Sequence, residues 1–200
     1  MMKPTGYHWL KTCLGAALAF FVSAASAQWD LDGERSRLSF ISVKNASVGE
    51  SHTFTSLAGS VGDDGQARVD IDLDSVETAI PIRNSRMREM LFETGTFPSA
   101  SITTTVDPDV IAQAGRAPTV VTMPFTVALH GSSADYDAAV LVSVDDDGSL
   151  HVATREPIVV DAGDFDLGAG VTALKEVAGL ASISSSVPVS AHLVFDAADK

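Results

Sequence analysis

Alternation of apolar and polar residues is the feature that most constrains the fold of this chain. In residues 67–74, three aliphatic side chains alternate with three aspartates, and similar alternation fills residues 121–130, 136–144 and 187–195. A period of two places apolar side chains on one face of a strand and polar side chains on the other. These segments therefore predict half-buried β-strands.

Weaker strand patterns and turn signals account for most of the remaining chain. Further strands are expected in residues 36–43, 52–61, 101–106 and 150–160. Residues 63–65 predict the turn of a hairpin, whereas residues 107–109 and 115–118 predict a turn and a loop. About eight strands joined by such turns indicate an antiparallel barrel or sandwich. Of the two, a barrel of about eight strands has an interior that can hold one small ligand.

Two short segments have a helical period instead. Met87, Met90 and Leu91 recur at the spacing of one helix face within residues 83–92. A second amphipathic stretch covers residues 171–178. The first helix fits two interpretations, a cap on a filled core or the wall and lid of a cavity.

The N-terminal segment has the pattern of a secretory signal. Lys3 and Lys11 precede a short apolar run at residues 14–22, and Ala25-Ser26-Ala27 is suited to cleavage. The apolar run is short for a membrane-spanning helix, so an uncleaved anchor is the less favoured alternative. We expect residues 1–27 to be a cleaved signal peptide and residues 28–200 to be one domain in the periplasm, with no stable membrane insertion.

Charge and cysteine content exclude several classes of function. The formal net charge is −13, and removal of the two signal lysines makes it more negative. Such a chain lacks the basic footprint that phosphate backbones require, so nucleic acid is not an expected partner. The single cysteine, Cys13, lies in the signal segment. The mature chain therefore has no disulfide, thiol nucleophile or thiolate metal ligand, which suits a bacterial periplasmic domain.

No catalytic or metal-binding motif is present. The mature histidines do not have metal-ligand spacing; they are His52, His130, His151 and His192. The aspartates of residues 70–74 imitate a calcium loop, but Ser75 stands where that loop requires glycine. The nucleophile elbow, phosphate loop and dinucleotide fingerprint are also missing. We therefore expect neither an enzyme nor a metal or cofactor.

Apolar residues on the strand faces and in the helical segments are the remaining candidates for a site. Flexible methionines adapt to irregular apolar ligands, and arginines can meet a polar head group. The candidate lumen and mouth residues are Phe40, Phe54, Ile71, Leu73, Met87, Met90, Leu91, Phe97, Phe125, Val127, Phe165 and Leu167, with Arg83 and Arg86 as head-group candidates. Periodicity does not separate an empty cavity from a filled core, so both interpretations stay open.

Three segments carry a family resemblance. They are Asp72-Leu-Asp-Ser-Val-Glu-Thr78, Arg83-Asn-Ser-Arg-Met-Arg-Glu-Met-Leu-Phe92 and Phe97-Pro-Ser-Ala-Ser-Ile102. Together they resemble the YceI-like family, and weaker similarity extends over roughly Trp29 to Phe195. One departure stands out, because Ile80-Pro-Ile-Arg-Asn84 occupies the place where the commonest family pattern has a polar Arg-Asp segment.

The resemblance implies a lipocalin-like, extended eight-stranded antiparallel barrel with one or two short helices. Members of the family are exported proteins that bind polyisoprenoids or other long-chain amphiphiles in the lumen, and no catalytic residues come with the family. The resulting hypothesis is a periplasmic protein, monomeric or homodimeric, that holds an isoprenoid lipid or quinone for transport or storage.

Two alternatives are kept beside this hypothesis. One is a stress-related structural module with a filled core. The other is a hydrolase or isomerase of an apolar substrate, which a pocket-facing acid near a histidine would favour, for instance Glu93 or Asp164.

Overall fold

The computed structural model describes Met1 and residues 27–198. The expected signal segment therefore lies almost wholly outside the described residues. Among the helices within them, none is long and apolar enough to cross a membrane.

Eight strands form a closed antiparallel ring, which confirms the expected barrel. In spatial order they are β1 (Ala27–Leu31), β4 (Leu57–Gly62), β5 (Gln66–Asp72), β7 (Ser99–Thr105), β8 (Thr119–Leu129), β9 (Ser132–Val144), β10 (Leu150–Thr154) and β12 (Ser186–Ala197). The ring closes where β12 pairs with β1, with Leu31 opposite Phe195. Closure leaves these strands with no free edge in this part of the molecule.

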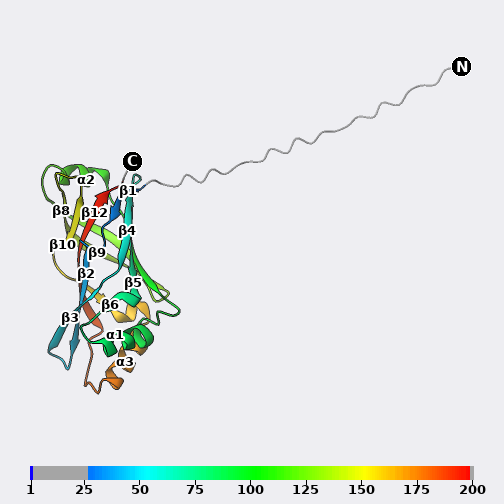
Figure 1. Cartoon of the computed structure of the whole chain (residues 1–200), viewed down its shortest axis with the longest axis vertical. Helices are drawn as coiled ribbons and strands as arrows, with labels where there is room; N and C mark the ends of the chain where they lie inside the picture. Colours follow the sequence, from blue (N-terminus) through cyan, green and yellow to red (C-terminus); the bar gives the residue numbers. More distant parts are fainter. Residues whose placement is uncertain (2–26, 199–200) are drawn as a thin grey trace.

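Four further strands extend the barrel along its axis. The long strand β12 pairs with β11 (Ile158–Asp161) on one edge and with β2 (Arg37–Lys44) on the other. The sheet continues from β2 to β3 (Val48–Phe54) and β6 (Val76–Glu77). Figure 1 shows β3 and β6 at the lower end of the molecule, near helices α1 and α3, with β1 and α2 at the opposite end.

The strand expected over residues 150–160 is divided into β10 and β11 around Glu156-Pro157. Two other predicted strands also have different bounds, for local reasons. The expected strand over residues 52–61 is divided into β3 and β4, because the Ser75 hydroxyl accepts hydrogen bonds from the amides of Thr55 and Ser56. The strand expected over residues 67–74 ends at Asp72, whose side chain caps the 3₁₀ turn η1 (Leu73–Ser75).

Within the described residues, three short helices accompany the barrel instead of one or two. They are α1 (Pro81–Arg86), α2 (Pro108–Ala114) and α3 (Gly168–Val177). The π-helical turn η2 (Met87–Leu91) continues α1, and the 3₁₀ turn η3 (Ala162–Phe165) precedes α3. Helix α2 begins within the predicted turn at residues 107–109 and ends just before the predicted loop at residues 115–118. It has only seven residues, too few for a clear period, and it is started by the Asp107 cap.

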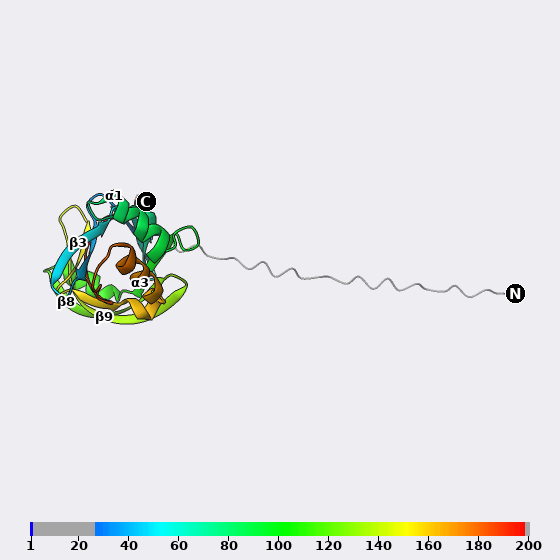
Figure 2. The same cartoon turned by 90° about the horizontal axis from the view of Figure 1, so that it is seen from below.

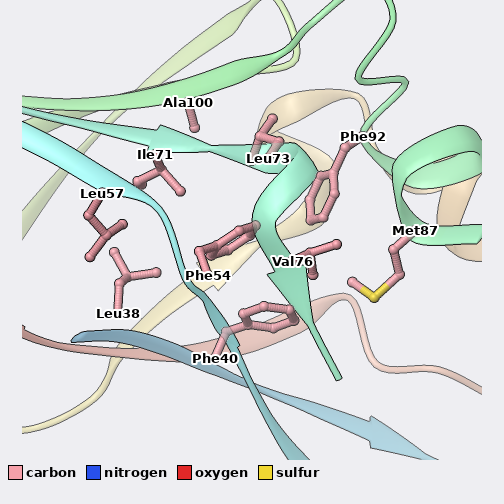
Figure 3. Close-up of a cluster of buried hydrophobic side chains, with 10 residues drawn as sticks. All are labelled: Leu38, Phe40, Phe54, Leu57, Ile71, Leu73, Val76, Met87, Phe92 and Ala100. Carbon is pink, nitrogen blue, oxygen red and sulfur yellow. The ribbon is translucent and has the colours of Figure 1, made fainter. Parts of the chain in front are cut away.

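The buried side chains form a packed end and a lining of the other end. The packed cluster, beside α2, contains Val61, Val69, Ala114, Ala138, Val140, Val142, Leu150 and Phe195. A second cluster contains Leu38, Phe40, Phe54, Leu57, Ile71, Leu73, Val76, Met87, Phe92 and Ala100, and Figure 3 shows it between the strands and η2. The barrel is therefore filled with side chains at the end beside α2.

Candidate functional site

An apolar cavity of about 470 Å³ occupies the lower half of the barrel. Its walls come from β2, β3, β5, β7, β8, β11 and β12, and from α1, η2 and α3. No buried member of the packed cluster beside α2 lines it, whereas eight members of the second cluster do. The volume lies in the range of roughly 300–1,000 Å³ that small-molecule pockets have.

Most of the sequence-predicted lumen residues line this cavity. They are Phe40, Phe54, Ile71, Leu73, Met87, Leu91, Phe125, Val127, Phe165 and Leu167. Arg83 and Arg86 line it as well. The structure thus brings together residues that lie more than a hundred positions apart in the sequence.

Met90 and Phe97 were predicted at the lumen or mouth, but they do not line the cavity. The π-helical turn changes the helical period after Arg86, so that the amide of Phe92 donates to the carbonyl of Met87. Met87 and Leu91 consequently face the cavity while Met90 turns away. Phe97 instead packs on His130 in the β8–β9 turn, with 4.4 Å between ring centroids.

Helix α3 and the segment after it contribute lining residues that the sequence analysis did not single out. They include Val177, Leu180 and Ile183. Residues 180–183 have no regular period, so the alternation did not mark them as lining residues. At the mouth, Ile82 and Val177 are 59% and 45% exposed. Ile82 and Val177 therefore form an apolar part of the rim of the cavity.

Gly170 sets how closely α3 approaches η2 at the mouth. Figure 2 shows α3 lying within the outline of the strands when the molecule is seen from below, with α1 beside it. A Cβ atom at Gly170 would lie 2.6 Å from the Met90 carbonyl oxygen and 2.8 Å from Leu91 Cα. Both are backbone atoms, so only glycine permits this contact.

The variant Gly170→Ala should therefore push α3 away from η2. We expect a loss of about 1–3 kcal/mol in the free energy of unfolding, the usual cost of overpacking, which chemical denaturation measures. Gly168→Ala is the matched control, because its Cβ would meet no atom within 4 Å. Equal stability of the two variants would contradict the tight contact.

The strands β2 and β3 carry polar side chains into one end of the cavity. Ser42, Lys44, Glu50 and His52 all line it. Glu50 accepts from Lys44 at 2.6 Å and from the Arg83 Nη1 atom at 2.9 Å. Ser42 Oγ and His52 Nε2 are 2.8 Å apart. On β2, Ser42 and Lys44 follow Phe40 at a spacing of two, and on β3, Glu50 and His52 precede Phe54 at the same spacing. Extending the alternation along each strand would have identified them as residues of the cavity face.

Electrostatics in this polar end keep Glu50 ionised and His52 neutral. The hydrogen bond from Lys44, with the charge of Arg83, holds the pKa of Glu50 below its usual value. Burial, with the nearby Arg83 cation, lowers the pKa of His52. The imidazole therefore favours its uncharged form in the folded protein.

Lowering the pH should destabilise the fold through His52. The unfolded chain takes up a proton at His52 near pH 6.5, whereas the folded protein resists it until lower pH. The free energy of unfolding should decrease as pH falls below about 6.5 and this contribution should level off below the folded-state pKa. Each proton contributes at most about 1.4 kcal/mol per pH unit. Denaturation at pH 7.5 and 5.5 should show a smaller difference for His52→Gln than for the parent, and equal differences would contradict this assignment.

The polar groups do not assemble a catalytic triad among the described residues. Ser42 and His52 resemble its first two members, but His52 Nδ1 has no hydrogen-bond partner there, where a triad requires a carboxylate. Glu93 Oε1 lies 3.9 Å from His130 Nε2, and Asp164 accepts from the Tyr136 hydroxyl at 2.8 Å. None of these last four residues lines the cavity. Within residues 27–198, acidic, histidine and cysteine side chains form no cluster that could hold a metal ion.

An extended antiparallel barrel that is packed at one end and hollow at the other defines a lipocalin-like barrel with an internal apolar cavity. The model of the YceI-like domain family matches residues 29–195 of this chain. The chain therefore belongs to the YceI-like family, as the sequence resemblance indicated.

Solved structures agree with this assignment. A polyisoprenoid binding domain from Saccharophagus degradans, implicated in plant cell wall breakdown, is 36% identical, with a TM-score of 0.82 over 86% of this chain and 100% of that one. BcnA from Burkholderia cenocepacia is 17% identical, with a TM-score of 0.65 over 82% and 98% of the two chains. A YCEI protein from Campylobacter jejuni is 14% identical, with a TM-score of 0.53 over 74% and 85%. The last two show the shared fold alone. No curated protein matches the chain.

Proposed function

We propose that this protein binds a long-chain amphiphile, a polyisoprenoid or an isoprenoid quinone, with its chain in the cavity of the barrel. The observation that carries the proposal is the apolar cavity, which continues from the buried cluster of β2, β3, β5 and η2 to the exposed rim. Each methylene moved from water into such a site contributes roughly 0.8 kcal/mol, so a long chain needs few polar contacts. The polyisoprenoid binding of the Saccharophagus degradans relative supports the same ligand class.

Export and storage belong to the same proposal. We infer that residues 1–27 are removed and that residues 28–200 act in the periplasm, where a water-insoluble lipid needs a carrier or a store. Binding without chemical conversion is favoured because no triad forms around His52 in the described part of the chain. The cavity also argues against a module whose core is filled.

A pair of adjacent variants tests whether η2 contributes to binding. Leu91→Asp places a carboxylate in the apolar cavity, whereas Met90→Asp places one outside it. We expect Leu91→Asp to weaken lipid affinity at least about tenfold, because an unpaired charge in an apolar site is costly. Met90→Asp should change affinity much less at a similar stability. Equal loss of binding in both variants would assign the effect to folding.

The direct test is a thermal-shift titration of delipidated mature protein with isoprenoid alcohols and quinones of increasing chain length. A ligand that binds only the folded state at a hundred times its Kd stabilises by about 2.7 kcal/mol, so Tm should rise. We expect the rise to grow with chain length until the cavity is filled. A Tm that no chain length changes would refute lipid binding.

A further inference from the structure

The cavity wall formed by β2 and β3 changes from apolar to polar toward the tip of their hairpin. Three cross-strand pairs with side chains on the cavity face define this change, namely Leu38–Phe54, Phe40–His52 and Ser42–Glu50. All six residues line the cavity. A ligand lying along this wall would meet apolar groups at one end and polar groups at the other, as an amphiphile requires.

His52 carries an unpaired polar atom at this transition. The residue is only 4% exposed, and its ring stands 5.2 Å from that of Phe40. Its Nε2 atom is hydrogen-bonded to Ser42, but Nδ1 has no partner among the described residues. When the Ser42 hydroxyl donates to Nε2, Nδ1 carries the proton and is a donor; when Nε2 donates to the hydroxyl, Nδ1 is an acceptor. Buried polar groups are usually paired, so this nitrogen calls for an explanation.

Arg83 has a second unpaired polar atom beside the same hairpin. Its Nη1 atom donates to Glu50 at 2.9 Å, and its Nη2 atom donates to the Thr78 carbonyl oxygen at 2.6 Å. Its Nε atom is buried and has no partner within the described part of the chain. The guanidinium is thus held by one N–H group of each terminal nitrogen, and Nε is its nitrogen without a partner among the described residues.

We propose that His52 and Arg83 form a subsite for an uncharged head group that carries a carbonyl or hydroxyl oxygen. This inference rests on the proposed function. A head-group oxygen supplies the missing hydrogen-bond partner of the unpaired nitrogens His52 Nδ1 and Arg83 Nε. The head group lies at the hairpin end of the cavity, and the chain extends past Phe40 and Phe54 toward the packed end of the barrel.

The occupied partners of Arg83 favour a neutral head group over a phosphate. Phosphate and carboxylate groups are bound most strongly by two parallel N–H groups of a guanidinium, and each terminal nitrogen of Arg83 already directs one N–H group to Glu50 or Thr78. The Glu50 carboxylate also pairs with both Lys44 and Arg83 and would compete with an incoming anion. The Nε–H group of Arg83 and the neutral imidazole of His52 suit a single carbonyl or hydroxyl oxygen.

The test compares four ligands of equal isoprenoid chain length: a quinone, an alcohol, a hydrocarbon without oxygen and a monophosphate. Dissociation constants are measured on the full mature protein by tryptophan fluorescence or calorimetry. We expect the quinone and the alcohol to bind roughly tenfold more tightly than the hydrocarbon, the gain of about one buried hydrogen bond, and more tightly than the monophosphate.

Two variants assign this preference to its residues. His52→Phe removes the imidazole beside Phe40 and Phe54, and Arg83→Lys keeps the charge near Glu50 but removes Nε. Each should bring the quinone and alcohol affinities to within about threefold of the hydrocarbon affinity. Ser51→Ala, at an exposed position on the other face of β3, is the control and should keep the full preference.

The outcomes separate the subsite from the proposed function. If the hydrocarbon binds as tightly as the quinone and the alcohol, the subsite is wrong while lipid binding stands. If the monophosphate binds most tightly, the neutral head-group class is wrong. If the preference for oxygen-bearing ligands survives in both His52→Phe and Arg83→Lys, the assignment of the subsite to these two residues is wrong. If none of the four ligands binds, the proposed function itself fails.

Discussion

The variant Val127→Trp should abolish binding of long-chain isoprenoids while the barrel stays folded. Val127 lies on β8, lines the cavity and packs against the cluster of Ala162, Phe165 and Leu167. An indole at this position would fill part of the cavity of about 470 Å³ and block the path of the chain. We expect affinity to fall at least about a hundredfold, because several methylene groups at roughly 0.8 kcal/mol each lose their place.

Ala128→Trp is the matched control for this blocking variant. Ala128 is the next residue on β8 and does not line the cavity, since successive strand residues face opposite sides. It should bind lipid with nearly unchanged affinity. Calorimetric titration measures both affinities, and circular dichroism reports whether each variant is folded. Full binding by a folded Val127→Trp protein would place the ligand elsewhere.

The variant Phe165→Ala should cause the largest loss of stability. Phe165 is 0% exposed and forms the buried cluster with Ala162 and Leu167, against which Leu91 and Tyr136 pack. Truncation of a fully buried phenylalanine typically costs about 3–5 kcal/mol, because the transfer free energy is lost and a cavity is left. The effect should reach the mouth as well, since Phe165 ends the turn η3 from which the chain enters α3.

Phe97→Ala provides the comparison for Phe165→Ala. Phe97 is half-buried against His130 and lies outside the cavity lining. Its truncation should cost clearly less, and urea denaturation of the ligand-free variants measures the difference. A cost below about 1 kcal/mol for Phe165→Ala would show that the cluster does not hold the lower barrel together.

The strands were the most predictable part of the fold because their period is local. The alternation in residues 121–130 predicts β8. Its apolar residues share one strand face, which also identifies Phe125 and Val127 as residues of the interior. The hairpin of β4 and β5 follows from the turn at residues 63–65. Closure of the ring was different, because the pairing of Leu31 with Phe195 joins residues at opposite ends of the chain.

Tertiary packing decided what the sequence pattern alone left open. Met90 had the spacing of a helix face, but the π-helical turn leaves Met87 and Leu91 in the cavity lining and Met90 outside it. Helix α2 was missed because seven residues show no clear period. The polar wall of Glu50 and His52 was missed because the lining was predicted mainly from apolar residues, although polar residues at the same spacing lie on the same strand face. Whether the interior was filled or hollow depended on packing that no local pattern records.

Native mass spectrometry of the mature protein tests the central claim most directly. The protein would be purified without detergent from the expressing organism, and the extra mass would be identified after organic extraction. We predict a discrete adduct that extracts as one long-chain isoprenoid lipid per protein, and its loss in Val127→Trp but not in Ala128→Trp. A mass that matches the protein alone, and that stays unchanged after incubation with isoprenoid alcohols and quinones, would contradict lipid binding.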